Sequence, residues 1–207
     1  MRSIWTSKDS TRKEKVMFEV YTDRARRITT RAVVQARSNG RVPTNAYHLL
    51  ASIISDEQDS VSVYTLLHFG ANVADLAKKA GEFALQRGKA IPRGLSYAKS
   101  AKVVFEKALA IAVKQSCPYV GSEHLFLAVL DMAESKELDP SIFSDFGLDI
   151  SQLKTHVLLE ISNWLELISQ ARIPLKELAD LFAAKGEEGK SAQIRRIIDD
   201  LDMIATS

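Results

Sequence analysis

The sequence holds a single cysteine, no long apolar run and no apolar segment at its N-terminus, and each absence argues against one class of protein. One cysteine among 207 residues, Cys117, cannot form an internal disulfide, which argues against a disulfide-stapled secreted fold. No stretch approaches the roughly 18 consecutive apolar residues of a membrane span. The first fifteen residues, MRSIWTSKDSTRKEK, are polar and lack the apolar core of a secretory signal. We therefore expect a cytoplasmic protein in a reducing compartment.

Composition and charge fit an ordinary globular domain with one uneven feature. Hydrophobic residues make up 46% of the chain and charged residues 26%, the balance of a folded protein with a real core. The net charge is only +2, but residues 1–41 hold eleven Lys or Arg against four Asp or Glu. This basic N-terminal part suggests nucleic-acid binding, which we keep as an alternative function. No helix-turn-helix or stacking-aromatic pattern accompanies it.

The chain contains an internal repeat. The segment VYTDRARRITTRAVVQARSNGRVPTNAYHLL, from Val20, matches SYAKSAKVVFEKALAIAVKQSCPYVGSEHLF, from Ser96, at an offset of 76 residues. The aligned pairs include Tyr21 with Tyr97, Ala25 with Ala101, Ala36 with Ala112 and His48 with His124. Farther on, Gly70 aligns with Gly147 at an offset of 77. We infer a tandem duplication joined by the Gly- and Pro-bearing residues 87–94.

Apolar residues recur three and four positions apart in both repeats, so the sequence predicts an all-α fold. In the first repeat we expect helices over residues 22–38, capped by Thr22, and from a cap at Thr44 to residue 54, and then over 61–69 and 73–85. In the second repeat we expect them over 98–115, 122–132, 140–146 and 150–169. Pro174 is predicted to start another helix, and a final helix carries an apolar stripe of Ile194, Ile197, Ile198, Leu201 and Ile204.

The stretch AKGEEGKS, residues 184–191, fits the relaxed pattern of a phosphate-binding loop. Such a loop requires a buried strand immediately upstream. The preceding apolar residues are instead spaced for a helix face: Leu175, Leu178, Leu181 and Phe182. Glu187 and Glu188 would also place two carboxylates beside a polyanion. We interpret this stretch as a turn between two helices, with Gly186 or Gly189 as the C-cap.

Candidate catalytic and metal-binding groups are sparse. His48 and His124 occupy equivalent positions in the two repeats, but neither has a further metal ligand three or four residues along its helix. We expect both to be buried and bonded to backbone. Cys117 has no helical His or Asp partner within reach by spacing, so we do not expect a thiol nucleophile. No nucleophile, base and orienting group share a site, so we predict no catalytic residue, no cofactor and no metal.

Several motifs together resemble a known family. They are MFEVYTDRARR at residues 17–27, the repeated Tyr-x-x-x-Ala-(Arg/Lys) helix start, VGSEHLFLAVL at 120–130 and the Phe-Gly turn of each repeat. These residues resemble the Clp N-terminal domain, or Clp repeat domain, of the ClpC type, over residues 17–168. The resemblance implies a pseudo-twofold bundle of two four-helix repeats without catalytic activity. It also implies docking of adaptors and substrates for an AAA+ ring that feeds a proteolytic chamber.

The resemblance divides the chain into five parts. Residues 1–16 form a polar basic extension, 17–88 the first Clp repeat, 89–95 a linker, 96–170 the second Clp repeat, and 171–207 a C-terminal helix pair. Trp164 is expected to pack against that pair. The ATPase modules of Clp unfoldases are absent from this sequence. We expect either a stand-alone accessory or decoy protein, which the separate helix pair favours, or the N-domain of a Clp ATPase.

The family's ligand site carries over only in part. In ClpC-type domains each repeat can bind phosphorylated arginine through a Thr at the first helix start and the Glu of a Gly-Thr-Glu-His motif. Here the first repeat keeps Thr22 but has Asn45-Ala46-Tyr47, and the second keeps Gly121-Ser122-Glu123-His124 but has Ala98, so each site is half present.

We expect peptide or adaptor binding through a set of six residues: Phe18, Tyr21, Thr22, Tyr97, Ser122 and Glu123. Structural roles are the alternatives. Thr22 suits a helix N-cap, and Glu123 suits a first-turn carboxylate favoured by the helix dipole. Phe18 and Tyr21 suit the core.

Overall fold

The computed structural model describes residues 19–38, 40, 42–56, 60–86 and 97–205. The predicted N-terminal extension, the linker 89–95 and Phe18 lie outside these residues. Helices account for nearly all regular structure in the described part, which contains two isolated β-bridges and no strand. The all-α prediction is therefore confirmed. Among the described residues, no helix combines the length and the apolar character needed to cross a membrane.

The two repeats contribute matching sets of helices. The first gives α2 (Asp23–Ser38), α3 (Ala46–Ile54), α4 (Val61–His68) and α5 (Val73–Gln86). The second gives α6 (Lys99–Lys114), α7 (Ser122–Glu134), the short α8 (Ser141–Ser144) and α9 (Ile150–Ala184). Gly70 and Gly147 follow α4 and α8 with φ of 76° and 68°, a conformation that glycine adopts without strain. The two Phe-Gly motifs thus mark equivalent turns.

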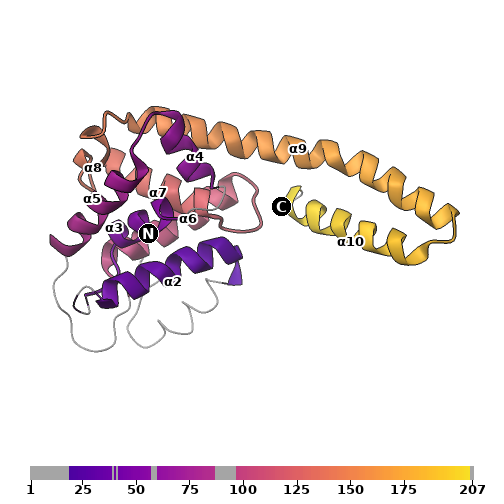
Figure 1. Ribbon diagram of the computed structural model, residues 1–207, viewed down its shortest axis with the longest axis horizontal. Helices are drawn as coiled ribbons and strands as arrows, with labels where there is room; N and C mark the ends of the chain where they lie inside the picture. Colours follow the sequence, from indigo (N-terminus) through magenta and orange to yellow (C-terminus); the bar gives the residue numbers. More distant parts are fainter. Residues whose placement is uncertain (1–18, 39, 41, 57–59, 87–96, 206–207) are drawn as a thin grey trace.

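The core is built around the equivalent helices α3 and α7. Every residue of α3 is buried, and ten of the thirteen residues of α7 are. α2 covers them with one amphipathic face whose buried side chains are mostly small: Ala25, Ile28, Thr29, Ala32 and Ala36. Figure 1 shows α3 and α7 inside the bundle, with α2 along one side and the first part of α9 along the other.

Two short backbone bridges tie the repeats together crosswise. Tyr21 pairs in parallel with Val120, and Thr44 pairs in parallel with Tyr97. The repeat offset of 76 converts one bridge into the other, because Tyr21 corresponds to Tyr97 and Thr44 to Val120. Thr22, after the first tyrosine, donates its N–H to the carbonyl of Val120 at 3.1 Å. Ala98, after the second, donates its N–H to the carbonyl of Thr44 at 2.8 Å. This reciprocity is the pseudo-twofold symmetry that the resemblance implied.

The cap of α3 differs from the prediction. Asn45, not Thr44, precedes the helix: its side chain accepts the N–H of His48 at 3.1 Å. The His48 ring in turn accepts the N–H of Asn45 at 3.2 Å, which completes a capping box. Thr44, the predicted cap, lies one residue before the true N-cap, and its backbone forms the bridge to Tyr97.

The predicted break in the C-terminal part is wrong. α9 is one helix of 35 residues, and Pro174, together with the predicted boundary at 170/171, falls inside it. Proline in a helix removes one backbone hydrogen bond and crowds the preceding turn. Pro174 is exposed, however, so its ring displaces no neighbouring element. Beyond a turn at Gly186 with φ of 74°, α10 (Glu188–Ala205) runs back along α9, and Figure 1 shows this hairpin projecting from the bundle.

Candidate functional site

Thr22 lies where the two repeats meet. Its hydroxyl accepts the N–H of Ala25 at 3.2 Å, which confirms the predicted cap of α2. Its own N–H donates to the carbonyl of Val120 at 3.1 Å, and the N–H of Val120 donates to Val20 at 2.8 Å. Val120 immediately precedes Gly121, the N-cap of α7. The crosswise bridge therefore brings the N-termini of α2 and α7 together.

Glu123 lies in the first turn of α7, and its carboxylate folds back over Gly121. A Cβ atom on Gly121 would collide with this carboxylate, so the absent side chain makes room for it. Ser122 donates its hydroxyl to Glu123 Oε2 at 3.2 Å, and His124 Nδ1 lies 3.2 Å from Oε1. The Glu123 side chain is 26% exposed.

The Glu123 carboxyl is held in its ionised form. Burial alone would raise its pKa, but the His124 ring, its own backbone N–H and the Ser122 hydroxyl lower the pKa by more. The pKa therefore lies below its ordinary value, and the group carries a negative charge at neutral pH.

This arrangement combines two opposite electrostatic features. The first N–H groups of a helix have no partner within the helix, and the helix dipole adds partial positive charge there. Two such ends meet beside Thr22 and are suited to an anion. Glu123 supplies the opposite sign and is suited to a guanidinium. A ligand that carries both groups would satisfy both features at once.

The equivalent position in the other half of the bundle lacks both the carboxylate and the threonine hydroxyl. Tyr47 stands where the second repeat has Glu123; it is 2% exposed, and its hydroxyl accepts the N–H of Asp139 at 2.9 Å. Ala98, the counterpart of Thr22, precedes α6 without a side-chain cap.

The half-present sites expected from the sequence paired residues within one repeat, whereas the crosswise bridges join the start of a helix in one repeat to the start of a helix in the other. The bridge from Tyr21 to Val120 brings Thr22 of the first repeat near the start of α7, which carries Glu123 of the second. The equivalent position has neither a threonine hydroxyl nor a carboxylate.

The tyrosines predicted to bind a ligand have mainly structural roles. Tyr21 is 1% exposed and packs edge-on against Phe105, with ring centroids 6.3 Å apart. Burial, with a smaller effect from Tyr97, raises the pKa of Tyr21. The binding role predicted for Tyr21 therefore has no exposed side chain to perform it. Tyr97 is half-buried and contacts the same Phe105 ring at 5.1 Å.

His48 and His124 bond to the backbone at the starts of their helices. His124 accepts the N–H of Gly121 at 2.9 Å, as His48 accepts that of Asn45, so the expected bonding to backbone is confirmed. Burial, and then the charge of Glu123, raise the pKa of Cys117, which keeps the thiol protonated. Among the described residues, no group of three or more His, Cys, Asp or Glu is placed to hold a metal.

The phosphate-loop pattern lies in the hairpin turn. α9 ends at Ala184 and α10 begins at Glu188, so a helix precedes the turn where a phosphate loop needs a strand. Lys190 pairs with Glu187 and lies over the Phe182 ring, 5.2 Å from its centre. The interpretation as a turn between two helices is confirmed. Lys185 caps α9, Gly186 follows it with φ of 74°, and Gly189 lies inside α10.

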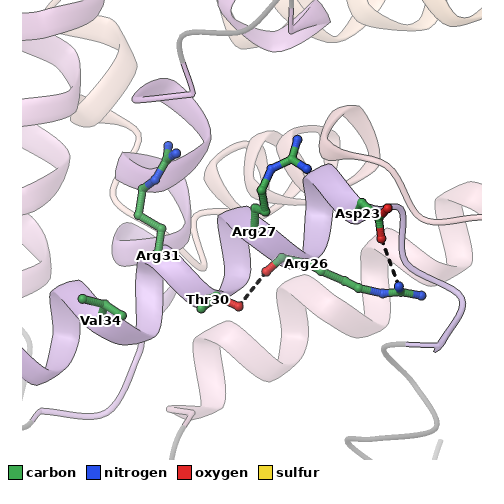
Figure 2. Close-up of a pocket in the computed structure, with 6 residues that line it drawn as sticks. All are labelled: Asp23, Arg26, Arg27, Thr30, Arg31 and Val34. Atoms are coloured by element: carbon green, nitrogen blue, oxygen red, sulfur yellow. Dashed lines mark hydrogen bonds and ion pairs between the residues drawn. The ribbon is translucent and has the colours of Figure 1, made fainter.

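A shallow pocket runs along the outer face of α2, beginning one residue after Thr22. It measures about 560 Å³ and is lined by Asp23, Arg26, Arg27, Thr30, Arg31 and Val34. Figure 2 shows Arg27 and Arg31 extending to the same side of the helix, while Arg26 reaches toward Asp23. The basic charge of this segment follows from the sequence, but the pocket does not. The four-residue spacing of Arg27 and Arg31 was the available signal.

Most arginines beside this pocket are already paired. Arg26 lies 3.1 Å from Asp23. Arg24 and Arg31 lie 3.3 Å and 3.9 Å from Asp56, a carboxylate that is 7% exposed. Much of the positive charge of α2 therefore holds the helix against the turn that follows α3.

Comparison with known proteins supports the same fold. Relatives include the ClpC/MecB negative regulator of genetic competence of Bacillus subtilis (strain 168), 26% identical over 198 residues, or 89% of this chain and 24% of that protein. They also include the chloroplastic chaperone ClpC1 of Arabidopsis thaliana, 27% identical over 200 residues, or 89% of this chain and 21% of that protein. The chain thus spans about a quarter of the length of these relatives.

Solved structures of N-terminal domains share the bundle. The Hsp104 N-terminal domain of Candida albicans matches with a TM-score of 0.56 and 21% identity, over 67% of this chain and 89% of that one. The N-terminal domain of ClpD from Arabidopsis thaliana matches with a TM-score of 0.53 and 20% identity, over 70% and 96%. The family model of the Clp repeat (R) N-terminal domain matches residues 20–139. The chain therefore belongs to the Clp repeat N-terminal domain family.

Proposed function

We propose that this chain is a non-enzymatic protein-interaction module of the Clp system. It binds a segment of a substrate or adaptor where the N-termini of α2 and α7 meet. The observation that supports this proposal is the crosswise bridge between Tyr21 and Val120, which joins Thr22 to the residue before Gly121 at the start of α7. The family assignment supports the role, because the Clp ATPases among its relatives act on proteins.

The ligand that best fits this site is an arginine side chain phosphorylated on its guanidinium. The phosphoryl oxygens would accept hydrogen bonds from the Thr22 hydroxyl and the helix N–H groups, while the guanidinium nitrogens would donate to Glu123. Since the mirror position has Tyr47 and Ala98 instead, we expect one such site per chain.

Calorimetry with free phosphoarginine tests this ligand. We expect one binding event per chain that is weakened at least tenfold by Glu123→Gln and by Thr22→Ala. Thr22→Ala also removes the cap of α2, so Thr22→Ser, which keeps cap and hydroxyl, should retain binding. Thr30→Ala is the matched control, because Thr30 is an exposed threonine of α2 that bonds only within the helix. Absence of heat in the unmodified chain would remove phosphoarginine as the ligand.

The broader role is tested by affinity purification from lysate of the source organism. The unmodified chain should retain a Clp ATPase, a Clp peptidase or their substrates, and Glu123→Gln should retain less of the substrates. If none of the three is retained by the unmodified chain, the Clp-system role is wrong and only the fold assignment stands.

The alternative function is nucleic-acid binding along α2. The pocket lined by Arg26, Arg27 and Arg31 is the observation in its favour, although Arg26 and Arg31 already pair with acidic residues. A salt titration separates the two functions. DNA binding below micromolar at near-physiological salt, with a steep salt dependence, would overturn the proposed protein-binding role.

A further inference from the structure

One side of the outer half of α9 carries exposed apolar side chains. Trp164, Leu167, Leu178 and Leu181 are between 41% and 60% exposed. Ala171 and Pro174, between them, are exposed as well. The expectation that Trp164 packs against the C-terminal helix pair is therefore wrong, since its side chain is 59% exposed. Among the described residues, no other element covers this face.

The spacing of these six residues is that of a coiled coil. Successive members lie 3, 4, 3, 4 and 3 residues apart, the a/d repeat that keeps one seam facing a partner helix. α10 packs on a different side of α9, where Ala179 is fully buried and Leu175 and Phe182 are half-buried. The outer half of α9 thus has two apolar sides, and α10 covers only one of them. We name the uncovered side, from Trp164 to Leu181, the α9 seam.

We propose that the α9 seam binds the α9 seam of a second copy of this chain, with the two helices antiparallel. The order of side-chain sizes along the seam is the argument, because it reads the same in both directions: two large, two small, two large. Antiparallel pairing places Trp164 against Leu181, Leu167 against Leu178 and Ala171 against Pro174 of the other copy. Ala171 and Pro174 therefore meet at the twofold axis, and their small side chains let the two helices approach closely there.

A twofold interface requires one surface that complements itself, and the seam meets this requirement in shape and in charge. Residues 160–185 contain three basic and four acidic side chains, so two copies bring together little net charge. A different protein as the partner would not require the palindromic order. This inference is independent of the site at Thr22 and Glu123, which lies in the bundle.

Molar mass in solution tests the pairing. Light scattering after size exclusion should give about twice 23.0 kDa for the unmodified chain at micromolar concentration. Leu167→Glu and Leu178→Glu should each shift it to the monomer mass. Ile173→Glu is the matched control, because Ile173 is 66% exposed on the same stretch of α9 but lies off the seam; it should leave the dimer intact. A monomeric unmodified chain, or equal disruption by Ile173→Glu, would overturn the proposal.

Cysteine cross-linking tests the antiparallel orientation on a Cys117→Ser background. The double variant Trp164→Cys, Leu181→Cys should form covalent dimers rapidly. Leu181→Cys alone should not, because antiparallel pairing separates the two copies of that position by about 25 Å along the helix. Efficient cross-linking of the single variant would show parallel pairing and overturn the proposed interface.

Discussion

Glu123 and Tyr47 occupy equivalent positions in the two repeats, and this difference leaves one carboxylate where the fold has places for two. Glu123 stays partly exposed and ionised above the N-terminus of α7. Tyr47 instead fills the core and bonds to the backbone of Asp139. The duplicated fold is therefore symmetric, while its candidate site is not.

Gly121 determines where the Glu123 carboxylate can lie. Its backbone, with φ of −89° and ψ of 178°, accepts any side chain, so Gly121→Ala should fold normally. The added methyl group would meet the Glu123 carboxylate, which can swing away at little cost. We therefore expect an unchanged melting temperature and at least a tenfold loss of phosphoarginine affinity, measured by calorimetry. Retained affinity would mean that the observed carboxylate position is unimportant for binding.

Gly81→Ala is the matched control for that substitution. Gly81 lies within α5 with open space around it. Alanine there should stabilise the helix by up to about 1 kcal/mol and leave the affinity unchanged.

His48 should make the stability of the fold depend on pH. Burial lowers its pKa from 6.5 to about 4, so the unfolded chain takes up a proton before the folded one does. The stabilisation is fully present above pH 6.5 and is lost as the pH falls toward 4, by about 3 kcal/mol in total.

Urea unfolding across this pH range should show the effect as a difference from His48→Gln. Glutamine at this position can still complete the capping box with Asn45 but does not titrate. Between pH 6.5 and 4, the free energy of unfolding of the His48→Gln variant should fall less steeply than that of the unmodified chain. Identical slopes for both proteins would contradict the assignment to His48.

At the scale of single elements, α2 is held by two ion pairs to one buried carboxylate, that of Asp56, as well as by its apolar face. Arg24 and Arg31 reach Asp56 from successive turns of α2. Removing the carboxylate leaves two cations that can still reach solvent, so the cost is below that of a fully buried pair. We expect Asp56→Asn to lower the free energy of unfolding by about 2 kcal/mol, measured in urea.

Asp23→Asn provides the comparison for Asp56→Asn. It removes the partner of Arg26, but its side chain is 84% exposed. The loss should be about 0.5 kcal/mol. If the two substitutions cost the same, the buried position of Asp56 does not matter for stability.

Helix positions followed from the sequence because amphipathic periodicity is local. The internal repeat then fixed the correspondence of the two sets of helices. Two local predictions failed. Thr44 cannot cap α3 because its backbone pairs with Tyr97. Pro174 does not begin a helix but lies inside α9, which continues through it despite the lost hydrogen bond and the crowded preceding turn.

At the scale of the whole molecule, the candidate site depends on how the repeats associate. Thr22 and Glu123 belong to different repeats and are 101 positions apart in the sequence. Periodicity and motif spacing within one repeat carry no information about this contact. The two reciprocal bridges are the observation on which the proposed site across both repeats rests. The sequence alone therefore suggests two half-present sites, although it singles out both Thr22 and Glu123.

The central claim is that one ligand site spans both repeats, and an NMR titration of backbone amides with phosphoarginine tests it most directly. The amides expected to shift are Asp23 and Arg24 at the start of α2, and Ser122 and Glu123 at the start of α7. Both pairs should move with a common midpoint, while Ala46 and Lys99, at the starts of α3 and α6, stay unchanged. Shifts confined to one repeat, or centred on Ala46 and Lys99, would contradict the account.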